Sequence, residues 1–207
     1  MYVRITGVKS APDRLEQGIA NFEQQVVPAA RQQPGYVGAA LLMNRDTGEA
    51  TSVTYWESLD ALNASEEMGI QARTQAAGST EADVLDVDRF EMVIIERVAD
   101  QAKSHTFARV NELYAQPERL DELIAFMRDN APSVMQQKGC RALLMGVNRM
   151  TGRCFVNSIW ETAPDREASE AAVTGLRKQA GEVAGGQARV TLGEVAFVEL
   201  KQPAPRV

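Results

Sequence analysis

Two helix-like stretches and two strand-like runs recur along the chain. From Leu15 and again from Leu120, apolar residues return every three or four positions, which is the spacing of one face of an α-helix. The apolar positions are Leu15, Ile19, Phe22, Val26 and Ala29 in the first stretch, and Leu120, Ile124, Met127, Ala131 and Val134 in the second. Apolar runs at 36–43 and 140–147 predict strands. Each helix is therefore expected to pack one apolar stripe against a sheet.

These patterns belong to an internal repeat. The segment Asn44-Arg45-Asp46-Thr47-Gly48 returns 104 residues later as Asn148-Arg149-Met150-Thr151-Gly152. Trp56 and Arg73 recur at the same offset as Trp160 and Arg177. Nearer the start of each half the offset is 105, because Arg4 matches Arg109. The change of offset predicts a one-residue difference in length late in the first helix.

Each half is predicted to run strand, helix, strand, strand, helix, strand. The shared Asn-Arg-x-Thr-Gly is typical of a hairpin turn. Second helices are expected to begin near Ser58 and Thr162, and closing strands at 90–95 and 194–200. This order is ferredoxin-like, with helices on one face of an antiparallel sheet.

The open sheet faces suggest how the two units are combined. Pairing two units inside one chain would cover both faces. The sequence therefore predicts an α+β fold of two tandem ferredoxin-like units that pair as a dimeric α/β-barrel. We expect the repeats at residues 1–97 and 106–207 with a connector at 98–105, either as a monomer with an internal pseudo-dimer or as a homodimer of it.

Composition narrows the class of partner. The net charge of −6 argues against nucleic acid, because phosphate binding needs clustered Lys and Arg. No apolar run is long enough for a membrane helix, and no signal-like segment is visible, so a cytoplasmic protein is expected. Cys140 and Cys154 have no metal-ligand spacing and are interpreted as reduced structural thiols.

Several segments resemble a known family. Gly35-Tyr36-Val37-Gly38, the hairpin turn and the segment 55–62 (YWESLDAL) resemble antibiotic biosynthesis monooxygenase-type (ABM) domains of the dimeric α/β-barrel superfamily. Gly139 and Ile159-Trp160-Glu161-Thr162 carry the likeness into the second half. The resemblance implies a cofactor-independent monooxygenase that acts on a small apolar or aromatic compound. The alternative is a non-catalytic small-ligand-binding or stress-related protein.

The superfamily also contains haem-degrading enzymes. Their second-helix tryptophan and histidine ligand would fall near Ser65 and Gln75, or near Ser169 and Gln179, so both side chains are missing. No haem cofactor is therefore expected. No metal is expected either, because no cluster of metal-ligating residues is visible in the sequence.

Candidate site residues follow from the repeat. Side chains alternate along a strand, so Arg4 shares a face with Thr6, and Arg109 with Asn111. Arginine suits an anionic oxygen, which makes Arg109, Asn111 and Arg4 the candidate catalytic residues. The candidate substrate-binding residues are Trp56, Trp160, Thr6, Arg73 and Arg177.

Each candidate also has a structural interpretation. Arg4 and Arg109 could pair with carboxylates at the interface between the halves, the two tryptophans could be core packing, and the two helix arginines could be solvated. Glu66 and Glu170 also match between the halves, and are interpreted as helix-surface charge. The mismatch of Thr6 with Asn111 favours the second half for activity.

Overall fold

The computed structural model describes residues 1–98, 104–186 and 188–201. The first half comprises β1 (Tyr2–Lys9), α1 (Leu15–Asn21), a π-helical turn (Phe22–Val26), α2 (Val27–Arg31), β2 (Tyr36–Asn44), β3 (Glu49–Trp56), α3 (Leu59–Ala64), α4 (Glu66–Thr80) and β4 (Asp83–Arg97). The second half comprises β5 (Thr106–Tyr114), α5 (Leu120–Met135), β6 (Cys140–Val147), β7 (Arg153–Trp160), α6 (Ala163–Ala168), α7 (Glu170–Ala184) and β8 (Arg189–Leu200).

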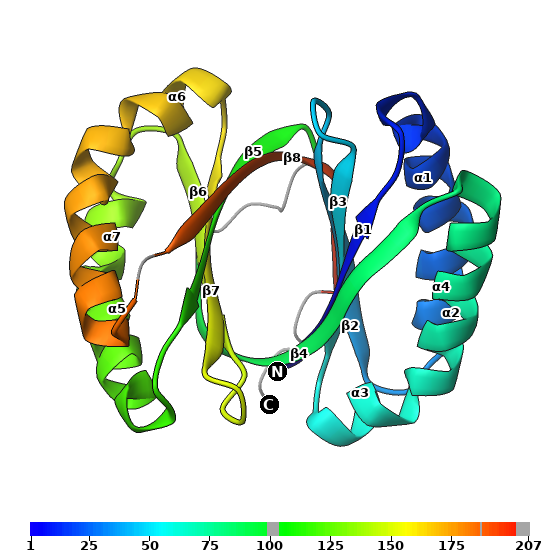
Figure 1. Ribbon diagram of the computed structural model, residues 1–207, viewed down its shortest axis with the longest axis horizontal. Coiled ribbons are helices and arrows are strands. Elements are labelled where there is room, and N and C mark those ends of the chain that lie inside the picture. Colours follow the sequence, from blue (N-terminus) through cyan, green and yellow to red (C-terminus); the bar gives the residue numbers. More distant parts are fainter. Residues whose placement is uncertain (99–103, 187, 202–207) are drawn as a thin grey trace. The chain divides into compact units, whose positions relative to one another are not determined.

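The strands confirm the predicted fold class. Their hydrogen-bonded order is β1-β3-β2-β8-β5-β7-β6-β4, which closes as a barrel. Within each half the first and third strands pair antiparallel, β1 with β3 and β5 with β7. Figure 1 shows α1, α2 and α4 together on one side of β1 to β3, and α5 and α7 together beside the strands of the second half. The chain is an α+β protein of two tandem ferredoxin-like units paired within one polypeptide.

The closing strands are longer than predicted. The chain forms two compact units, and β4 passes from the first to the second after Arg89, while β8 passes from the second to the first after Glu194. The start of β4 was missed because its Asp and Val residues alternate in an exposed segment, and the burial pattern that marks a strand is absent there. The repeat boundaries 1–97 and 106–207 stay predictions, and residues 99–103 of the expected connector lie outside the described residues.

Local sequence signals account for the elements around the site. The apolar stripes pack in the core of their own unit, through Leu15 and Phe22 in the first and Leu120 and Met127 in the second. Beyond Phe22 the prediction was wrong by one position, because Val27 and Ala30 are buried in place of Val26 and Ala29. In both hairpin turns the glycine adopts a positive φ, 74° at Gly48 and 72° at Gly152, which a residue with a Cβ adopts only with strain.

The two first helices differ by a π-helical turn. The first half has this turn at Phe22–Val26, whereas α5 is α-helical over its whole length. A π-turn takes up one extra residue within a helix and is frequent at functional sites. The structure thus places the predicted one-residue difference at this turn.

Candidate functional site

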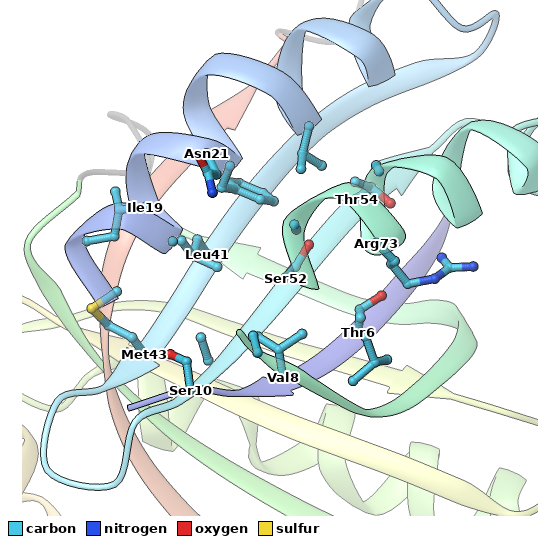
Figure 2. Close-up of a pocket in the computed structure, with 18 of the residues that line it drawn as sticks. Thr6, Val8, Ser10, Ile19, Asn21, Leu41, Met43, Ser52, Thr54 and Arg73 are labelled. Carbon is cyan, nitrogen blue, oxygen red and sulfur yellow. The ribbon is translucent and has the colours of Figure 1, made fainter. Parts of the chain in front are cut away.

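The first unit contains a cavity between its helices and its strands (Figure 2). Its volume is about 110 Å³, and an apolar protein cavity of roughly 150 Å³ holds a benzene ring. Most of the wall is apolar, formed by Val8, Leu15, Ile19, Phe22, Val26, Leu41, Met43 and Met68 among others. The cavity is therefore somewhat smaller than one that holds benzene, and its apolar wall suits a molecule no larger than about one aromatic ring.

The polar lining residues are not spread evenly. They are Arg4, Thr6, Ser10, Asn21, Ser52, Thr54 and Arg73. In Figure 2, Thr6 and Arg73 lie next to each other at one end, and Met43 and Ser10 lie at the other. The cavity thus has a cationic end.

Arg4 is held rigidly at this end. Its Nη1 donates to Ser65 Oγ at 3.1 Å, and its Nη2 donates to the Leu62 carbonyl at 2.8 Å and to Glu66 Oε2 at 2.9 Å. Burial lowers the pKa of Arg4, although the charge of Glu66 opposes this effect. Arg4 does pair with a carboxylate, as the structural interpretation held. That carboxylate lies on α4 of the same unit, so the expected place of pairing, between the halves, was wrong.

The carboxylate of Glu66 holds together the arginines at the cationic end. Its carboxylate accepts hydrogen bonds from Arg4 at 2.9 Å, Arg73 at 2.8 Å and Arg89 at 2.8 Å. Burial alone would raise the pKa of Glu66, but the hydrogen bonds from Arg89 and Arg73 and the charge of Arg4 lower it to about 2. The interpretation as helix-surface charge was therefore wrong for Glu66, whose side chain is only 29% exposed and binds three guanidinium groups.

Arg73 keeps part of its hydrogen-bonding capacity unused. Its Nη2 donates to Glu66, whereas its Nη1 is buried and has no hydrogen-bond partner among the described residues. A Cβ on Gly69, one turn earlier in α4, would lie 2.9 Å from Arg4 Nη1 and 3.0 Å from Arg73 Nη1. Glycine at this position thus lets both guanidinium groups approach the helix closely.

The second unit repeats the cluster around a smaller cavity of about 50 Å³. Arg109 donates to Ser169 Oγ at 3.0 Å and forms an ion pair with Glu170 at 2.9 Å. Arg177 also binds Glu170, and its Nε donates to Asn111 Oδ1 at 2.9 Å. The structure therefore brings Arg109, Asn111 and Arg177 together, but side chains fill much of the space beside them.

Three pairs of residues explain the difference in volume. Gly18, Gly69 and Ala72 of the first unit correspond in the repeat to Leu123, Val173 and Leu176 of the second. Leu123 is fully buried in the second core, and Val173 and Leu176 pack against that core. A Cβ on Gly18 would meet nothing within 4 Å. The candidate site is therefore in the first unit, where small residues leave the space open, and this signal was present in the aligned halves.

The two tryptophans do not line the cavities. Trp56 and Trp160 are fully buried, and neither is among the lining residues. Each indole Nε1 donates at 3.0 Å to the hydroxyl two residues earlier, Thr54 in the first unit and Ser158 in the second. This geometry favours packing over substrate stacking.

The described residues offer neither a reactive thiol nor a metal-binding cluster. Cys140 and Cys154 are free and buried, and burial raises their pKa values to about 11 and about 12, so neither thiol is a ready nucleophile. No group of three or more His, Cys, Asp or Glu side chains in the described ranges could hold a metal ion. Over the same ranges, no helix combines the length and apolar character needed to cross a membrane.

Comparison with known proteins agrees with the fold. Residues 1–77 match the family model for antibiotic biosynthesis monooxygenases. An uncharacterised protein of Mycobacterium tuberculosis is 24% identical over 192 residues, which cover 90% of this chain and 83% of that protein.

Two solved structures extend the likeness over nearly the whole chain. A candidate monooxygenase of Fusobacterium nucleatum superimposes with a TM-score of 0.74 at 14% identity, over 97% of this chain and 94% of its own. An anthrone oxidase-like protein superimposes with a TM-score of 0.73 at 13% identity, over 100% of this chain and 97% of its own. At such identities the likeness shows the fold alone.

Proposed function

We propose that this chain, whose residues 1–77 match the antibiotic biosynthesis monooxygenase family model, oxygenates a small, mainly apolar aromatic compound in its first-unit cavity without a cofactor. The observation that carries the proposal is the cavity itself. It is about one ring in size, has apolar walls and ends at a cluster of guanidinium groups.

The cationic end fits the first chemical step. A phenolic substrate must lose its hydroxyl proton before it can react readily with oxygen, and fixed positive charge favours the ionised form. Arg4 and Arg73 line the cavity, and three guanidinium groups share the single carboxylate of Glu66. The cluster therefore retains positive charge that lowers the pKa of a bound phenol.

The overall reaction is balanced without an external reductant. The substrate anion supplies the electrons that reduce molecular oxygen. One oxygen atom forms the new carbonyl of a quinone-type product, and the other leaves as water together with the two hydrogens that the substrate loses. The apolar walls exclude bulk water from the anion and from its oxygen adduct.

The lining also sets a limit on the substrate. Among the described residues, no carboxylate or histidine side chain lines the cavity, and Glu66 is too weak a base to take the proton. The substrate must therefore be acidic enough to ionise under the influence of the arginines. The same observation favours a second candidate, a protein that binds such a molecule without turnover.

An oxygen electrode with a panel of single-ring phenols and hydroquinones tests the proposal. We expect oxygen uptake matched by product, and a loss in kcat/KM of roughly tenfold or more for Arg73→Gln. Arg177→Gln alters the matching arginine beside the filled cavity and should retain activity per folded protein. Binding without uptake would support the second candidate, and the absence of both would contradict both functions.

A further inference from the structure

We propose that the first cavity holds a negatively charged oxygen of its ligand between Arg73 and Thr6, at the place that Asn111 fills in the second unit. The inference deepens the proposed function, on which it rests. It names the ligand as a single-ring aromatic that carries an ionised oxygen.

The two sites have matching frames. Thr6 stands opposite Ser52 in the pairing of β1 with β3, and Asn111 stands opposite Val156, the residue that repeats Ser52, in the pairing of β5 with β7. Arg73 binds Glu66 seven residues before it, and Arg177 binds Glu170 over the same separation. A contact in one unit therefore indicates what the equivalent space in the other can accept.

In the second unit an amide completes the site. Asn111 Oδ1 accepts from Arg177 Nε at 2.9 Å, while its Nδ2 donates to the Val156 carbonyl at 3.1 Å. The side chain is thus fixed at both ends, with its oxygen against the guanidinium group.

In the first unit the corresponding acceptor is missing. Threonine ends one atom beyond its Cβ, whereas the oxygen of asparagine lies one atom further out. Thr6 is buried and lines the cavity beside Arg73. The donor without a partner among the described residues is Arg73 Nη1, whereas the nitrogen that Asn111 satisfies in the second unit is Arg177 Nε, so the two units offer different nitrogens of the matching guanidinium groups. Buried donors are nearly always satisfied, so Arg73 Nη1 marks a place for an acceptor from a ligand.

Charge favours an anion over a neutral acceptor. In the first unit Arg89 is a third guanidinium on Glu66, and the residue 104 positions later is Gly193, which has no side chain to offer Glu170. Three guanidinium groups on one carboxylate leave the first cluster with a net positive charge, which favours an anion as the missing acceptor. A phenolate and a carboxylate share the required chemistry.

Binding of probes that need no oxygen tests the inference. We expect 4-nitrophenol, whose ionised form is coloured, and benzoate to bind the full-length protein more tightly than toluene, and bound 4-nitrophenol to ionise at lower pH than in water. Thr6→Asn introduces the side chain of the second unit and should weaken anion binding roughly tenfold to a hundredfold. The unliganded protein should remain at least as stable, because the amide finds the Ser52 carbonyl and Arg73. Arg177→Gln, which alters the matching arginine beside the second cavity, should bind both anions as the natural chain does.

Each outcome decides the inference. Unchanged anion binding in Thr6→Asn, or in Arg73→Gln as a second variant, would overturn it, as would equal affinity for toluene and the anions. Binding of only one of the two anions supports the site and identifies the kind of oxygen. Anion binding without oxygen uptake by any phenol would uphold the site and contradict the oxygenase. Oxygen uptake that is unaffected by Thr6→Asn would contradict the anion site and uphold the oxygenase.

Discussion

Replacing Gly18 by leucine would give the first unit the residue that Leu123 supplies in the second. A glycine inside a helix is less favourable than alanine by about 1 kcal/mol. A Cβ on Gly18 would meet nothing within 4 Å, so the cavity has room for the side chain of leucine. Burial of its three further carbons stabilises the folded chain by about 0.8 kcal/mol each. Restriction of the new side chain costs about 1 kcal/mol. We expect Gly18→Leu to raise the free energy of unfolding by about 2 kcal/mol.

The same substitution should abolish ligand binding. Leucine at this position occupies space that the ligand needs, in a cavity of about 110 Å³. Denaturant unfolding measures the gain in stability, and binding of 4-nitrophenol with oxygen uptake measures the loss of function. Gly18→Ala is the control, because it should gain about 1 kcal/mol from helix propensity while leaving most of the cavity open.

Two results would refute this reasoning. If Gly18→Leu binds and reacts as the natural chain does, the first-unit cavity is not the site. If it loses stability while Gly18→Ala gains it, the space beside Gly18 is not available to a side chain.

Further predictions concern the cationic end and the core. The folded-state pKa of Glu66 lies near 2, below its ordinary value of 4.5, so its contribution to stability is complete above about pH 4.5 and is lost as the pH falls toward 2. After allowance for solvent screening this contribution is about 2 kcal/mol, and acid titration of unfolding should show it in the natural chain and not in Glu66→Gln. Gly69→Ala should displace the Arg73 guanidinium and weaken binding of benzoate without unfolding the chain, and unchanged affinity would contradict the role of this glycine. Trp160→Phe removes the indole hydrogen bond to Ser158 and should cost about 1 kcal/mol in thermal unfolding, with oxygen uptake retained.

The fold was predictable because the repeat doubles every local signal. The motif at Asn44–Gly48 recurs at Asn148–Gly152, and this repetition supports a turn at both places. Both turns have the expected positive φ at glycine. The start of β4 could not be predicted in this way. Its exposed Asp and Val residues become a strand through pairing with distant segments, which local propensity does not encode.

The site was only partly predictable. Arg4 and Arg73 were chosen because the halves share their positions, and Thr6 because it lies on the same strand face as Arg4. The role of Glu66, in contrast, depends on contacts between residues about sixty positions apart. Polar asymmetry between Thr6 and Asn111 favoured the second half, whereas the larger cavity is in the first. A polar residue attracts attention in a sequence, while a cavity is made by residues that are small, such as Gly18 and Ala72.

The passage of β4 and β8 from one unit into the other has a consequence for how the protein tolerates dilution. A single repeat on its own would lack the strand segment that the other repeat contributes, and would have to obtain it from a second molecule, so that its folding would depend on concentration. In the fused chain the missing segment is covalently attached, and completion of each sheet is an intramolecular event. The duplication thus makes completion of the first unit's sheet independent of how many copies of the protein are present.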